Sequence, residues 1–414
     1  MSRKLLKQIR NEWASNVWLA VELLVVSVVL WYILDYFYVT YRVLSAPLGF
    51  DVEHCYKLSF ADVTDKNPSY IPDRTNRQLV DDMLEILNRA QHLPMVEAAS
   101  ISNNSHPYNG SNSGSTVWRD TLYNQGYLIR RYVTPDFVRV FRYQGARGET
   151  PEELAKMLDE GKVLLNNSLF KNYGHEMTEF IGKQFCVDDS SNVKTLGAAL
   201  IGPRYSDFMT FDNTIIMNLI TERFGWGLNE VCIRVKPEMD KDIVETLMAQ
   251  SESLFHVGNQ LLVNVVPFKD IKRAVLQEDK NSMMYMYVGL GFLLLNVFLG
   301  LFGTFWFRTQ QRVGEIAIRK AMGATGWEVS RRLIGEGLLL LLIVTPLAYG
   351  IDCLLTYFGL SNYYEGDTAS VAFLRALGCA AAAAGLIALM IVAGVWFPAS
   401  RAQKIDPAVA LKDE

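Results

Sequence analysis

Residue types that often carry chemistry are present in this sequence, but their spacing fits no common catalytic or metal-binding motif. The histidines form no H-E-x-x-H and do not pair with cysteine at a metal-ligand spacing. They are His54, His92, His106, His175 and His256. Two Gly-Lys pairs, Gly161-Lys162 and Gly182-Lys183, lack the earlier glycine and the following Ser or Thr of a phosphate-binding loop. We therefore expect no catalytic residue, no metal site and no cofactor bound directly by this chain.

Nucleophilic catalysis has equally little support. No G-x-S-x-G is present, and Ser105-His106 lies in the polar stretch 103–116, where we expect a mobile loop and ordinary surface residues. The sequence leaves an extracytoplasmic hydrolase as an alternative only if folding brings together catalytic residues that are distant in the sequence. Of the five cysteines, Cys353 and Cys379 lie in apolar runs, and one disulfide among Cys55, Cys186 and Cys232 is left open.

Charge and hydropathy indicate a membrane protein. The formal net charge of -4 gives no basic face for nucleic acid. Half of the residues are hydrophobic, and they gather in four long runs. The runs lie near 17–34, 284–307, 333–355 and 371–397. Each is long enough, at about 1.5 Å rise per residue, to cross a hydrocarbon core of about 30 Å, so we predict four transmembrane helices.

Lysine and arginine define the expected orientation. They flank the first run (Arg3, Lys4), lie between the second and third (Arg319, Lys320) and follow the fourth (Arg401), whereas 361–370 has none. The positive-inside rule places both termini in the cytoplasm. The predicted parts are an amphipathic N-terminal helix (1–15), transmembrane helix 1 (16–41), an extracytoplasmic domain (42–282), transmembrane helix 2 (283–307), a cytoplasmic segment (308–332), transmembrane helix 3 (333–358), an external loop (359–370), transmembrane helix 4 (371–397) and a cytoplasmic tail (398–414).

The domain between helices 1 and 2 mixes two periodicities. Residues 76–90 place apolar side chains at helical spacing, whereas 231–237 and 261–268 alternate or run apolar as strands do. We therefore predict a large α+β domain, with two small subdomains, inserted into a membrane α-helical protein. Few charges fall in the spans, and we expect them near helix ends, within reach of water or headgroups: Glu22, Glu336, Asp352 and Arg375.

The cytoplasmic segment, "RTQQRVGEIAIRKAMGATGWEVSRR", shows the most local order. Glu315 lies early and Arg319 and Lys320 lie late in a short helical pattern, which suits the helix dipole, and Gly323 is a suitable C-terminal stop. Thr325 and Glu328 have the spacing of a capping box. We predict helix, sharp turn, helix, a rigid element that a cytoplasmic motor could move.

This segment resembles the signature of the FtsX-like domain in MacB-type ABC transporter permeases. Glu315, Ile316, Ile318, Arg319, Lys320, Ala321, Gly323, Ala324 and Glu336 fall on that signature, whereas Ala317 stands where glycine is frequent. Stretches such as "YVTPDFVRVFRYQGARGETPEE" and "ALIGPRYSDF" resemble the MacB-type extracytoplasmic domain, and "FPASRAQKIDPAVALKDE" resembles the family's C-terminal pattern. The resemblance extends over nearly the whole chain.

The resemblance implies a non-catalytic permease subunit that works by mechanotransmission. Its partners would be a dimeric cytoplasmic ABC ATPase, which binds ATP and Mg, a second permease copy or paralogue, membrane lipids, and a periplasmic adaptor or outer-membrane component. The ATPase-coupling residues would be Arg312, Glu315, Ile316, Ile318, Arg319, Lys320, Met322 and Gly323. The alternative is an FtsX-like signalling subunit that activates an external partner such as a cell-wall hydrolase. The substrate, and the choice between homodimer and heterodimer, stay open.

Overall fold

The computed structural model describes residues 13–110, 113–124, 126–209, 213–219, 229–311, 314, 318, 322–323, 325–360 and 369–402. The chain divides into two compact units. One is a helical unit formed by Met1–Leu44 and Lys280–Glu414, and the other is a sheet-rich unit formed by Ser45–Asp279. The predicted N-terminal amphipathic helix and most of the cytoplasmic tail lie outside the described residues.

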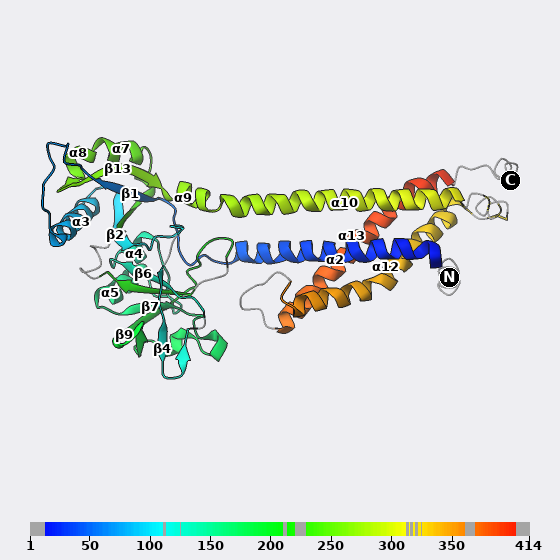
Figure 1. Ribbon diagram of the computed structural model, residues 1–414, viewed down its shortest axis with the longest axis horizontal. Helices are drawn as coiled ribbons and strands as arrows, with labels where there is room; N and C mark the ends of the chain where they lie inside the picture. The colour runs from blue at the N-terminus through cyan, green and yellow to red at the C-terminus, as the bar shows by residue number, and fades with distance from the viewer. Residues whose placement is uncertain are drawn as a thin grey trace. The chain divides into compact units, whose positions relative to one another are not determined.

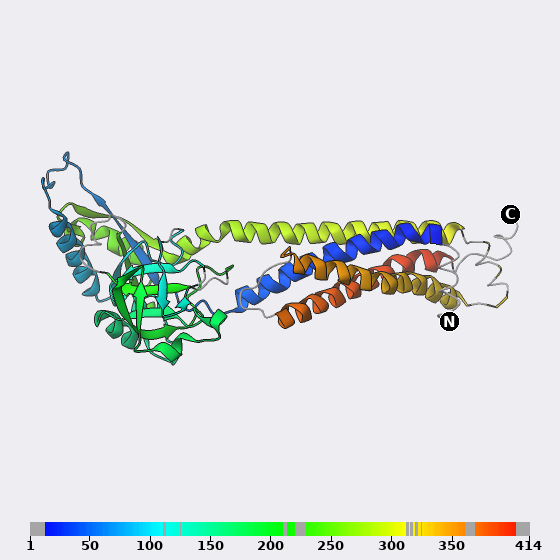
Figure 2. The ribbon, with the colours of Figure 1, turned by 60° about the horizontal axis from the view of Figure 1, so that its bottom comes forward.

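The helical unit contains four helices long and apolar enough to cross a membrane. They are α2 (Trp13–Ser45), α10 (Gln277–Gln311), α12 (Gly326–Tyr357) and α13 (Ala369–Ala402). The four helices run alongside one another (Figures 1 and 2). They share one apolar core. Leu23 of α2, Leu301 of α10, Leu340 of α12 and Ile387 of α13 are all buried in it. The chain is therefore a multi-pass membrane protein, with apolar helices where the sequence predicts them.

Buried charges distinguish this helical unit from a purely apolar bundle. Arg375 of α13 forms an ion pair with Asp35 of α2, with 2.9 Å between Nε and Oδ1 and side chains 5% and 1% exposed. One helical turn away, the indole N–H of Trp31 donates to the carbonyl oxygen of Ala376 at 3.1 Å. These contacts fix the register of α2 against α13, since an unpaired charge in apolar surroundings is costly.

The expectation that span charges reach water is wrong at three of its four positions. Arg375, Asp352 and Glu336 are buried, and Glu336 lies 3.5 Å from Arg332 on its own helix. Glu22 is partly exposed, and its carboxyl group packs against Gly300 of α10, where an added Cβ would lie 2.4 Å from Oε1. Hydropathy alone cannot reveal these positions because it does not show which helix faces meet.

The sheet-rich unit is built on one long path of paired strands. The order is β12-β13-β1-β11-β2-β6-β10-β7-β9-β8-β4-β5, with β3 pairing β6. Only β10 with β6 and β7 with β9 pair in parallel among the described strands. The strands are β1 (Cys55–Asp62), β2 (Val96–Asn103), β3 (Ser113–Gly114), β4 (Val117–Arg119), β5 (Leu122–Tyr123), β6 (Ile129–Val133), β7 (Val163–Asn166), β8 (Gln184–Val187), β9 (Asp189–Leu200), β10 (Thr214–Asn218), β11 (Asn229–Val235), β12 (His256–Val257) and β13 (Gln260–Pro267).

Helices cover both faces of the sheet (Figure 1). α3 (Asn76–Gln91), as predicted, and α7 (Ile243–Ala249) pack on one face with Val231 and Ile233 of β11. On the other face lie α4 (Phe137–Val140), α5 (Pro151–Asp159) and α9 (Phe268–Val275). The remaining short helices are α8 (Ser251–Leu254), η1 (Lys171–Tyr173), η2 (Met177–Phe180) and η3 (Pro237–Met239).

The ion pair of α2 and α13 gives the first testable prediction. Arg375→Met leaves the Asp35 carboxylate buried without its cation, so we expect the full chain in detergent to lose about 3–5 kcal/mol of unfolding free energy. Replacing both residues, Asp35→Leu with Arg375→Met, should recover most of that loss. Arg331→Met, at an exposed arginine, is the control. A double variant no more stable than the single one would contradict the pairing.

Candidate functional site

The turn between α10 and α12 is the part of the predicted coupling segment that the structure describes best. α10 ends at Gln311 and α12 begins at Gly326. The Met322 N–H donates to the Ile318 carbonyl oxygen at 3.0 Å, which is a helical i to i-4 bond. Gly323 has φ +93°, a backbone angle that favours glycine and commonly ends a helix. A helical turn therefore stops at Gly323.

The next helix, α12, begins three residues after Gly323, and Thr325 is its N-cap. Thr325 has an extended backbone (φ -75°, ψ 153°), and its hydroxyl oxygen accepts from the Glu328 N–H at 3.4 Å. In return, the Thr325 N–H donates to a Glu328 carboxylate oxygen at 2.9 Å. This reciprocal capping box, which the sequence spacing predicts, satisfies two donors at the helix start. Little slack is left between the turn and α12.

The other predicted coupling residues are described only in part. Arg312, Glu315, Ile316, Arg319 and Lys320 lie outside the described residues. Ile318 and Met322 are 49% and 82% exposed. Trp327, which the sequence interpretation passed over, is 60% exposed directly after the cap. The turn thus presents large apolar side chains beside a run rich in charge, a composition suited to contact with another molecule.

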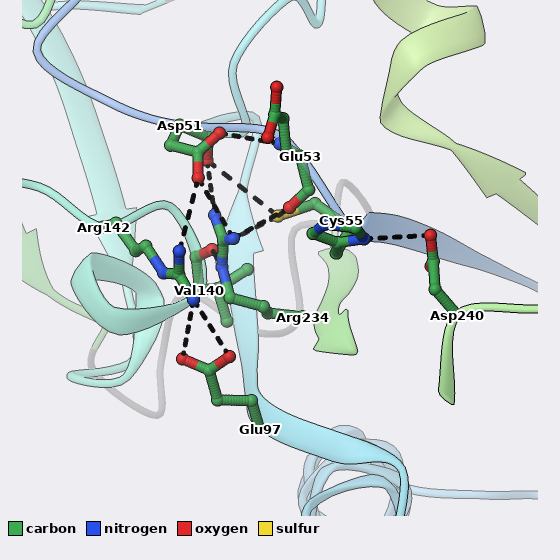
Figure 3. A network of polar contacts seen from close by, with 9 residues as sticks. Asp51, Glu53, Cys55, Glu97, Val140, Arg142, Arg234 and Asp240 are labelled. Atoms are coloured by element: carbon green, nitrogen blue, oxygen red, sulfur yellow. Dashed lines mark hydrogen bonds and ion pairs between the residues drawn. The ribbon is translucent and has the colours of Figure 1, made fainter. Parts of the chain in front are cut away.

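A second polar site lies where the chain enters the sheet-rich unit. Arg234 of β11 has no exposed surface, and its guanidinium donates to three main-chain oxygens (Figure 3). The acceptors are Val140 at 2.6 Å, Glu53 at 2.8 Å and Asp51 at 2.8 Å. An Asp51 carboxylate oxygen lies 3.2 Å from the same guanidinium. Arg234 therefore fastens the segment 46–54, called here the connecting segment, to β11 and α4.

Neighbouring groups extend this network (Figure 3). Arg142, with φ +47°, lies between Glu97 at 3.2 Å and Asp51 at 3.8 Å. The Cys55 thiol donates to the Val140 carbonyl oxygen at 3.2 Å. Burial raises the pKa of Cys55 to about 12, so the sulfur stays a protonated donor. All five cysteines are free in the structure.

Ser105 and His106 correct a sequence prediction. They are 0% and 2% exposed, not surface residues of a mobile loop. Their backbone N–H groups donate to one Glu230 carboxylate oxygen at 2.8 and 3.0 Å, and the Ser102 hydroxyl donates to the same atom at 2.8 Å. The Ser105 hydroxyl donates to the Asn103 carbonyl oxygen at 2.6 Å. This serine is therefore a structural hydrogen-bond donor.

The His106 ring is neutral in this setting. Its Nδ1–H donates to the Pro107 carbonyl oxygen at 2.7 Å, and its Nε2 accepts from the Lys57 ammonium group at 3.0 Å. Burial lowers the pKa of His106, and the cations Lys57 and Arg131 lower it further, whereas Glu230 opposes them. The composition of segment 103–116 does not indicate that Ser105 and His106 are buried, because the Glu230 carboxylate that binds their N–H groups lies on the distant strand β11.

This lowered pKa predicts a pH dependence of stability. The unfolded histidine titrates near pH 6.5 and the folded one lower, so below about pH 6.5 the unfolded state binds more protons. Stability should therefore fall as the pH drops below about 6.5. His106→Gln should flatten the curve of unfolding temperature against pH, measured on the full chain, whereas His92→Gln, at an exposed histidine, should not. Equal slopes in all three proteins would disprove the assignment.

Comparison with known families agrees with the helical unit. Residues 287–407 match the family described as FtsX-like permease C-terminal. The match supports an FtsX-type ABC permease. It covers most of α10, the capped turn and the whole of α12 and α13, and it does not include the sheet-rich unit. None of the curated proteins compared with this chain matches it. In the residues that the structure describes, no group of three His, Cys, Asp or Glu side chains could hold a metal ion.

Proposed function

We propose that this chain is the permease subunit of a MacB/FtsX-type ABC transporter and acts by mechanotransmission. A separate cytoplasmic ATPase dimer closes on ATP, displaces segment 308–332, and so moves the sheet-rich unit, which exports or extracts a substrate outside the membrane. The observation that carries this proposal is the FtsX-like match, because it contains both the capped turn and the helices on either side of it.

The local geometry supports a coupling role for the turn. A helix stop at Gly323 and a cap at Thr325 leave few free backbone angles between two helices. Such an element transmits a displacement, whereas a flexible loop would absorb it. The exposed Met322 and Trp327 offer apolar contact area, and the arginines and lysines around them fit a cytoplasmic location.

The remaining parts of the proposal rest on the charge distribution and on the family resemblance. The lysine and arginine distribution supports cytoplasmic termini and an extracytoplasmic sheet-rich unit between transmembrane helices 1 and 2. The family resemblance implies a bacterial inner membrane. The subunit would pair with a second copy or a paralogue. ATP and Mg would be bound by the ATPase. A periplasmic adaptor or outer-membrane component would receive the substrate, for which the large sheet-rich unit offers ample surface.

Charge changes in the coupling segment test the proposal. Glu315→Ala and Arg319→Ala should each weaken association with the partner ATPase at least about tenfold, or about 1.4 kcal/mol, because a few residues of an interface carry most of its binding energy. ATP turnover of the membrane complex should fall with it. Lys412→Ala, in the predicted cytoplasmic tail, is the matched control. Unchanged association and turnover in both variants would overturn the coupling role.

A second experiment separates transport from signalling. The full chain is purified with whatever partners bind the sheet-rich unit. An adaptor or outer-membrane component supports transport, whereas a cell-wall hydrolase instead supports the FtsX-like signalling alternative.

A further inference from the structure

One loop of the sheet-rich unit contacts both chain connections to the long helices. The loop 201–209 follows β9 directly. The first connection is the connecting segment, which continues from α2, and the second is α9, which leads through a single residue, Leu276, into α10. All of the contacts described below lie within the sheet-rich unit.

The first connection is held through Arg204. This side chain is buried, and its guanidinium donates to the Ala46 carbonyl oxygen at 2.8 Å and to that of Pro47 at 3.1 Å. The Arg204 N–H donates to the Leu48 carbonyl oxygen at 3.0 Å. Three successive carbonyl groups are thus bound by one residue. Gly49 has φ +76°, and a Cβ there would lie 2.2 Å from the Ile201 carbonyl oxygen, so only glycine permits this approach.

The second connection is held through Asp207. Its carboxylate lies 2.6 Å from the Lys272 ammonium group of α9 and accepts from the Tyr108 hydroxyl at 2.6 Å. The ammonium group also lies 5.5 Å from the centre of the Tyr108 ring. Burial, and then the hydrogen bond to Asp207, raises the pKa of Tyr108, so the phenol stays a donor. These charge-assisted bonds have a defined geometry.

The N-terminal end of the loop is held by the sheet, because residue 201 directly follows β9. β9 pairs with β7 in parallel and with β8 antiparallel, and the Ile201 N–H donates to the Gln144 carbonyl oxygen at 3.0 Å. A pull on the loop therefore acts on paired strands.

We propose that loop 201–209 is a strap, with Arg204, Asp207 and Lys272 as positioning residues, that ties the two membrane connections to each other and to β9. Displacement of either connection then reaches β9 and β8 as one movement. This role rests on the proposed function, since the displacement originates in the ATPase.

The test uses the full chain with its ATPase in lipid nanodiscs and amide hydrogen exchange as the readout. Lys272→Met removes the bond to Asp207. Arg273→Met is the matched control, because it removes the neighbouring cation of α9. The Arg273 side chain is 72% exposed, and its partner Asp270 lies on the same helix. Lys272→Arg keeps a positive charge at position 272, next to Asp207 and the Tyr108 ring.

Without ATP, Lys272→Met should raise exchange of the Arg204 amide, bonded to the far connection, at least about threefold. Arg273→Met and Lys272→Arg should not. With ATP, wild type should change exchange in β8 and β9, and Lys272→Met should reduce that change at least about threefold. If the Arg204 amide exchanges at the wild-type rate in Lys272→Met, the strap proposal is overturned. A wild-type protein whose sheet-rich unit does not respond to ATP contradicts the proposed function instead, and the ATP-free comparison still decides the strap.

Discussion

The buried guanidinium of Arg234 determines how the chain enters the sheet-rich unit. It supplies donors to carbonyl groups of Asp51, Glu53 and Val140, which lie outside the strand ladders. Carbonyl groups left without donors are costly, so the path of residues 51–53 depends on this side chain, while Arg204 binds the earlier part of the connecting segment. The ion pair of Arg234 with Asp51 adds little net stability, because both charges give up solvation. The effect of Arg234 is on specificity: the observed path of the connecting segment has a lower free energy than paths that leave these carbonyl groups without donors.

The helical unit obeys the same constraint with different groups. Asp35 and Arg375 are too polar for apolar surroundings unless they meet, and Trp31 needs an acceptor for its N–H. Meeting both needs selects one rotation and one vertical register of α2 against α13. Apolar packing alone would tolerate neighbouring registers, because similar aliphatic side chains recur along both helices.

The sequence predicted what local rules control. Hydropathy found the four long helices, helical and alternating patterns found α3, β11 and β13, and T-x-x-E found the cap of α12. Each of these signals lies within one element. The family resemblance of the helical unit is supported by the match over residues 287–407.

The errors at Ser105, His106 and Arg375 concern polar residues whose partners lie far along the chain. Ser105 and His106 stand in a stretch rich in serine, asparagine and glycine, a composition typical of surface loops. Glu230, more than a hundred residues later, converts them into buried donors. Asp35 and Arg375 are a further case. One sequence cannot reveal such pairs, since either residue alone is equally compatible with exposure to water.

The distribution of these interactions bears on how a movement could pass along the chain. A long helix conserves displacement along its axis, so losses arise where it joins another element. At the start of α12 the join is stiffened by a local cap, whereas the connecting segment is stiffened by arginines from distant strands and loops. Between α9 and α10 only the buried Leu276 intervenes. These joints have one physical basis. In each of them, backbone N–H and C=O groups are hydrogen-bonded within the protein, whereas in a flexible joint they would be hydrogen-bonded to water.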